Sequence, residues 1–88
     1  MTAAFFFVVM MANLYPDGSR ALWVFDFADF PTREQCLEFG KGNYLELGIM
    51  ASSDYAEDFD NPRPMAWSCM TQEEIDSGKK PQGLKVKI

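Results

Sequence analysis

Residues 3–12 form one unbroken apolar run, AAFFFVVMMA. The run is too short to span a bilayer, which takes about 20 apolar residues. It is rich in phenylalanine and valine, which favour strands, and a turn signal follows it. We therefore predict a strand buried on both faces in the centre of a sheet, and the rest of the chain must cover it.

The run also raises the question of a secretory leader. No Lys or Arg precedes it, and only Met-Met-Ala resembles a cleavage site. We expect the run to belong to the fold and the protein to be cytoplasmic. The two cysteines leave the compartment open.

A hairpin should follow the first strand. Pro16-Asp17-Gly18 separates two apolar runs, and this sequence suits a tight turn. The second strand is predicted over residues 21–27. Its aromatic face (Trp23, Phe25 and Phe27) should meet a helix, while Leu22, Val24 and Asp26 lie on the opposite face.

A long helix is predicted to begin at Arg33. Thr32 and Gln35 fit a capping box, and an apolar or small stripe continues to about residue 52. Gly40 and Gly48 should let its backbone approach the sheet. A straight helix would place Leu45 and Ile49 on its charged side, so we expect a kink at residues 40–42 that turns them inward. The alternative is an exposed apolar spot.

A third strand is predicted over residues 65–70, followed by a second capping box, Thr71 to Glu74, and a short helix over residues 72–76. Residues 84–88 alternate as a strand would, so they could add a fourth strand, pair with a partner chain or fray. We expect residues 1–78 to form one α+β domain and residues 79–88 to form a basic tail or an added strand.

The predicted fold is ββαβ, with a three-stranded antiparallel-type sheet in the order 2-1-3 and one helix packed on one face. A single helix cannot cover both faces. The second face should therefore be covered by the C-terminal tail or by another protein molecule, which includes a second copy of the chain.

Charge is distributed unevenly. Residues 26–76 hold 12 acids and three bases, a net charge of −9, within a chain of net charge −5. An acidic body repels phosphate backbones, so we expect no direct nucleic-acid partner and no membrane partner, but a protein with a basic surface. The acids predicted to contact that partner are Glu38, Glu46, Asp54, Glu57, Asp58 and Asp60.

Chemical sites are not indicated. The chain has no histidine, which is the commonest general base and metal ligand, and its two cysteines are too few for zinc. Cys36 and Cys69 should be neighbours in the fold, either as buried thiols, as a disulfide or, least favoured, as a reactive thiol. The acids near residue 58 lack the spacing of a calcium loop. We expect no cofactor, no metal and no catalytic residues.

The chain resembles small uncharacterised proteins encoded by bacteriophages and bacteria. The resemblance rests on the P-D-G hairpin, a strand ending in F-A-D-F, T-R-E-Q-C at a helix start and a later W-S-C strand, and it covers residues 5–70. It implies a ββαβ fold and a virus-encoded accessory protein that binds a host protein.

The function predicted from the sequence is a small, acidic, non-catalytic binding protein, such as a phage-encoded inhibitor or modulator that acts by occluding a host protein in the host cytoplasm. The alternative is a structural protein that assembles with itself. A homodimer would then form through the second sheet face or through residues 84–88.

Overall fold

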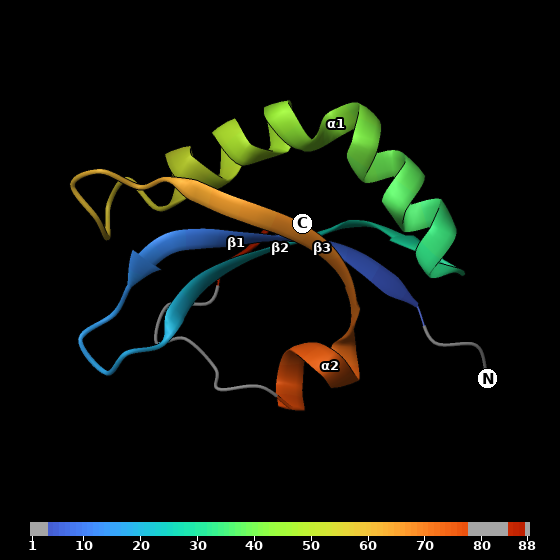
Figure 1. Cartoon of the computed structure of the whole chain (residues 1–88), viewed down its shortest axis with the longest axis horizontal. Helices are drawn as coiled ribbons and strands as arrows, with labels where there is room; N and C mark the ends of the chain where they lie inside the picture. Colours follow the sequence, from blue (N-terminus) through green and yellow to red (C-terminus); the bar gives the residue numbers. More distant parts are fainter. Residues whose placement is uncertain (1–3, 78–84, 88) are drawn as a thin grey trace.

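The computed structural model describes residues 4–77 and 85–87. The elements are β1 (Phe5–Leu14), β2 (Arg20–Phe30), α1 (Arg33–Asp54), β3 (Pro64–Thr71), α2 (Gln72–Ser77) and β4 (Lys85–Lys87). Four strands form one sheet in the order β3-β1-β2-β4. α1 covers one face of the sheet and α2 lies on the other (Figure 1).

The predicted α+β fold and the 2-1-3 strand order are confirmed. β1 pairs antiparallel with β2 on one side and with β3 on the other. The apolar run therefore lies in the centre, where Phe7, Val8 and Met11 are fully buried. β4 pairs parallel with β2 and adds the fourth strand that the alternating tail allowed.

The hairpin forms as predicted. Gly18 has a φ of 87°, a left-handed conformation that glycine adopts without strain. The Gly18 N–H donates to the Tyr15 carbonyl at 2.8 Å, and the Asp17 carboxylate accepts from the Ser19 N–H at 2.9 Å. β2 then continues to Phe30 rather than ending at residue 27, since Phe30 pairs with Phe5 beyond a shift of register between Phe5 and Phe7.

The main core lies between α1 and the sheet. Trp23 and Phe25 face the helix as predicted, and the Phe25 ring stacks on Phe39 with centroids 5.8 Å apart. The buried members of this core are Phe7, Val9, Met11, Ala21, Trp23, Cys36, Leu47, Ala51, Tyr55 and Cys69. The aromatic residues supply most of its area, which a chain this small needs.

The second face of the sheet is covered by the chain itself. Ile75 of α2 packs on Val8 and Val24, and all three are buried. Both hydrogen bonds of the second capping box form. The Thr71 N–H donates to the Glu74 side chain at 2.9 Å, and the Glu74 N–H donates to the Thr71 hydroxyl at 3.1 Å. This box fixes α2 under the sheet. The expectation that the C-terminal tail or another protein molecule covers this face is therefore wrong for Val8 and Val24, which α2 covers.

The expected kink that would bury Leu45 and Ile49 is wrong. α1 runs unbroken from Arg33 to Asp54 and arches over the sheet (Figure 1), yet Leu45 is 69% exposed and Ile49 is 71% exposed. The helix instead packs on the sheet at Gly40, which lies directly against the side chains of Trp67 and Phe7. Leu47 and Ala51 then face the core, so Leu45 and Ile49 must face outward.

Candidate functional site

An apolar groove lies between the C-terminal half of α1 and the start of β3. It has a volume of about 540 Å³. Its lining residues are Val9, Tyr44, Leu45, Gly48, Ile49, Ser52, Pro64, Met65, Ala66 and Trp67. Ser52 is the one residue of these ten with a polar side chain that is not aromatic, so the groove is an apolar surface open to solvent.

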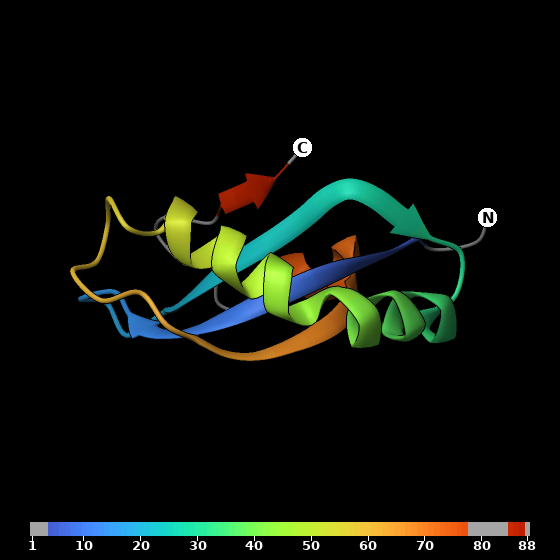
Figure 2. The ribbon, with the colours of Figure 1, turned by 90° about the horizontal axis from the view of Figure 1, so that it is seen from above.

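Two glycines of α1 give the groove its shape. A Cβ on Gly40 would lie 2.3 Å from Trp67 Cζ3, so only glycine allows the helix to pack this closely on the sheet. Gly48 has no side chain that could fill the space between the helix and Pro64. α1 crosses the sheet diagonally (Figure 2), and Gly48 is among the residues that line the groove.

The walls of the groove hold most of the exposed large apolar side chains of the described residues. Leu45 and Ile49, one helical turn apart, form a ridge on α1, and Met65 on β3 is 54% exposed opposite them. The Tyr44 ring stacks on Trp67 with centroids 6.3 Å apart and closes one end. Contiguous exposed apolar surface of this kind typically marks an interaction site.

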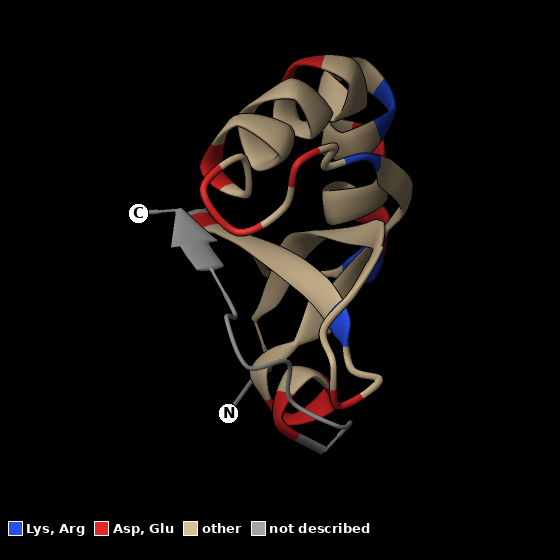
Figure 3. Cartoon of the chain, turned by 90° about the vertical axis from the view of Figure 1, so that its left-hand side faces the viewer, with Lys and Arg blue, Asp and Glu red and all other residues tan. Residues whose placement is uncertain are grey.

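The acids predicted as a binding surface do not form one cluster. Asp54, Glu57, Asp58 and Asp60 gather at the end of α1 and in the loop after it (Figure 3). Glu38 lies 16 residues before Asp54, about 24 Å along the helix. Glu38 also pairs with Lys41 at 3.5 Å, and Glu46 is exposed between the two regions.

Two of these acids fasten the fold. The buried Trp23 indole N–H donates to Asp54 Oδ2 at 2.7 Å, and the Tyr15 hydroxyl donates to Asp58 Oδ2 at 2.9 Å. Burial raises the pKa of Tyr15, and the hydrogen bond to Asp58 raises it further, because both favour the neutral phenol. Asp54 therefore serves the core, whereas Glu57 and Asp60 remain exposed in the loop.

Cys36 and Cys69 form a disulfide that joins α1 to β3, with a Cα–Cα distance of 6.0 Å. The structure thus decides between the states that the sequence left open, because the two cysteines are bonded and are not a pair of buried thiols. Both cysteines are fully buried. The prediction that the two cysteines are neighbours in the fold is confirmed, because α1 docks closely at Gly40 and its first turn comes within reach of β3.

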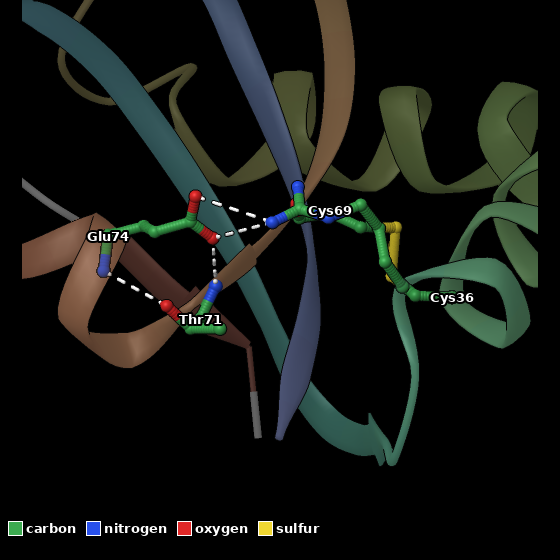
Figure 4. A network of polar contacts seen from close by, with 5 residues as sticks. Cys36, Cys69, Thr71 and Glu74 are labelled. Carbon is green, nitrogen blue, oxygen red and sulfur yellow. Dashed lines mark hydrogen bonds and ion pairs between the residues drawn. A yellow bond between two sulfur atoms is a disulfide. The ribbon is translucent and has the colours of Figure 1, made fainter. Parts of the chain in front are cut away.

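Figure 4 shows Thr71 and Glu74 together with the Cys36–Cys69 disulfide. Arg33 forms a second link here, between α1 and β3. Its guanidinium donates to the Cys69 carbonyl at 2.8 Å and to Glu74 at 3.2 Å, and it lies over the Phe5 ring. The hydrogen bond from the Thr71 N–H lowers the pKa of Glu74, and the charge of Arg33 lowers it further. Sequence reasoning missed this contact, because nothing in the sequence places Arg33 opposite Glu74.

No other chemical centre stands out in residues 4–77 and 85–87. No group of three or more metal-ligating side chains comes together there. Within the same residues, neither helix has the length and apolar character needed to cross a membrane. The groove is thus the feature of the described structure that most needs a functional explanation.

No protein-family model, curated protein or solved structure matches the chain.

Proposed function

We propose that this chain is a small non-catalytic protein that binds another protein through the groove between α1 and β3. The observation that carries the proposal is the exposed ridge of Leu45 and Ile49 facing Met65. Leaving these side chains in water forgoes about 1.5–3 kcal/mol for each one that could be buried. A partner that covers them recovers that free energy.

The resemblance to small phage-encoded proteins extends the proposal to a modulator that occludes a host protein. The acidic body would steer it toward a basic surface. Among the acids predicted from the sequence, Glu46 and Asp60 are exposed and suited to this role. Glu38 is paired with Lys41, and Asp54 and Asp58 are bonded to core aromatic residues.

The disulfide bears on where the protein works. Disulfides persist in oxidising compartments and are rare in the cytosol of most cells. The expected cytoplasmic location stays a prediction, and the Cys36–Cys69 bond argues for an oxidising compartment instead. Alkylation of free thiols in intact cells, followed by mass measurement, distinguishes the two.

Capture of the partner tests the proposed function. Tagged wild-type protein is compared with Ile49→Asp in the groove and with Leu14→Asp as a matched control, because Leu14 is 53% exposed on β1 and lies outside the groove. We expect one stoichiometric protein that binds wild type and Leu14→Asp but not Ile49→Asp. Equal capture by all three forms would contradict the proposal.

Self-assembly is the second candidate. Burial of Val8 and Val24 under α2 removes the reason for a dimer through the second sheet face. Light scattering on the purified protein tests whether the chain still forms a homo-oligomer. A defined oligomer that Ile49→Asp dissociates, with no captured partner, would favour the structural function.

A further inference from the structure

We infer that the groove holds a short cationic amphipathic helix of the partner, which inserts apolar side chains beside Leu45 and Ile49. This inference rests on the proposed function and specifies the chemistry of the partner. Three features of the structure lead to it: the length of the groove, the state of the neighbouring strand edge and the charge around the groove.

The groove has the length of two helical turns. Its wall on α1 runs from Tyr44 to Ser52, nine residues that together rise about 12 Å. A helix places side chains at positions i, i+4 and i+7 along one face over nearly the same length. Val9, which is 2% exposed, forms the floor on which such anchors would rest.

A strand is a poorer occupant, because features at both ends of β3 disfavour the pairing of another strand with its outer edge. Arg33 donates to the outward carbonyl of Cys69, and Glu74 accepts from the N–H of Thr71. At the other end Pro64 has no N–H, and the pairing with β1 is irregular between Met10 and Met11. Such devices prevent the addition of another strand.

The charge around the groove favours a cationic segment over a second copy. Residues 33–64, which include α1 and the loop after it, carry seven acids and three bases. Glu34, Glu38 and Lys41 continue the face of α1 that bears Leu45 and Ile49, and because Lys41 pairs with Glu38, these three residues leave a net charge of −1. A second copy would bring its own net charge of −5 against these acids, whereas lysines flanking the anchors of a partner helix would be attracted.

Designed peptides of about 15 residues provide the probe, since shorter helices are marginal in water. The first carries leucines at i, i+4 and i+7 among alanines and lysines. The second has the same composition with leucines at alternate positions, as in a strand. The third is the first with glutamate in place of lysine. Binding is measured by fluorescence anisotropy with each peptide labelled.

The first peptide should bind about tenfold or more tightly than the other two, and its affinity should fall as salt rises. Ile49→Asp should weaken its binding about tenfold or more, although the added negative charge would strengthen a purely electrostatic attraction. Leu14→Asp, with the same added charge, should not weaken it. If circular dichroism shows that Ile49→Asp is unfolded, Leu45→Asp replaces it.

Tight binding of the strand-patterned or the acidic peptide would overturn the inference, and so would undiminished binding to the folded groove variant. A dimer that Ile49→Asp dissociates would assign the groove to a second copy. If no peptide binds while the captured protein still requires Ile49, the inference fails and the proposed function stands.

Discussion

Arg33 and Glu74 meet across the outer edge of β3, with Nη2 and Oε1 3.2 Å apart. The two residues belong to the first turns of α1 and α2, which lie on opposite faces of the sheet (Figure 4). This contact and the Cys36–Cys69 disulfide tie both helices to the same strand. The end of β3 near Cys69 is therefore closed, and the groove opens toward its other end.

The acid dependence of stability should report on Glu74. Its pKa is lowered in the folded state, so the carboxylate stabilises the fold above its ordinary pKa of about 4.3, and this contribution is lost as the pH falls through the lower folded-state pKa. Glu74→Gln should therefore lose less stability than wild type between about pH 6 and about pH 3. Urea unfolding across this range measures the free energy of unfolding of both proteins. If that free energy falls equally with pH in wild type and in Glu74→Gln, the role given to Glu74 is contradicted.

Gly40 and Gly42 of α1 should respond differently to substitution by alanine. At Gly40 the added Cβ would meet Trp67 at 2.3 Å, and at Gly42 no atom lies within 4 Å. Gly40→Ala should destabilise the protein by about 1–3 kcal/mol through overpacking. Gly42→Ala should stabilise it by about 0.5–1 kcal/mol, because alanine is the better helix former.

Thermal unfolding followed by circular dichroism measures both substitutions. A change of 1 kcal/mol shifts Tm by roughly 4–8 °C in a domain of this size. If Gly40→Ala were as stable as Gly42→Ala, α1 would not be docked on Trp67 as the structure has it.

The disulfide should contribute much of the stability. The closed loop spans 33 residues, for which the loss of unfolded-chain entropy is worth roughly 3–4 kcal/mol. Total stabilities of small domains are about 5–15 kcal/mol. Cys36→Ala with Cys69→Ala should therefore lower the urea midpoint strongly, and a reducing agent should do the same to wild type but not to the double variant.

Asp54 and Asp60 separate structural acids from surface acids. Asp54→Ala would leave the buried Trp23 N–H without its acceptor and should cost about 1–3 kcal/mol. Asp54→Asn keeps an acceptor oxygen and should cost less. Asp60→Ala changes an exposed loop residue and should leave the free energy of unfolding within about 0.5 kcal/mol of wild type. Equal stability of Asp54→Ala and Asp60→Ala would contradict the role of Asp54.

Local signals in the sequence predicted most of the fold. The apolar run placed β1 in the centre, Asp17-Gly18 marked the hairpin, and Thr32 and Thr71 marked the starts of both helices. Each of these depends on neighbouring residues alone. The cover of the second sheet face by Ile75 was not anticipated, although the capping box at Thr71 predicted the helix that carries it.

The candidate site was harder to predict, because it depends on how α1 docks. Leu45 and Ile49 were recognised as misplaced on a polar helix face, but the expected kink explained them wrongly. Whether they face outward depends on the contact of Gly40 with Trp67, which joins residues 27 positions apart. The same docking brings Cys36 to Cys69, whose proximity the sequence did predict, and Arg33 to Glu74, which no local pattern in the sequence indicates.

Site-specific photocrosslinking tests most directly whether the groove between α1 and β3 is the surface that contacts the partner protein. A photoreactive side chain replaces Ile49 in the groove, Leu14 on β1 or Asp60 in the acidic loop, and the crosslinked products are identified by mass spectrometry. The account predicts one foreign protein crosslinked efficiently from position 49 and not from position 14. Efficient crosslinking from position 60 or 14 with none from position 49 would contradict it.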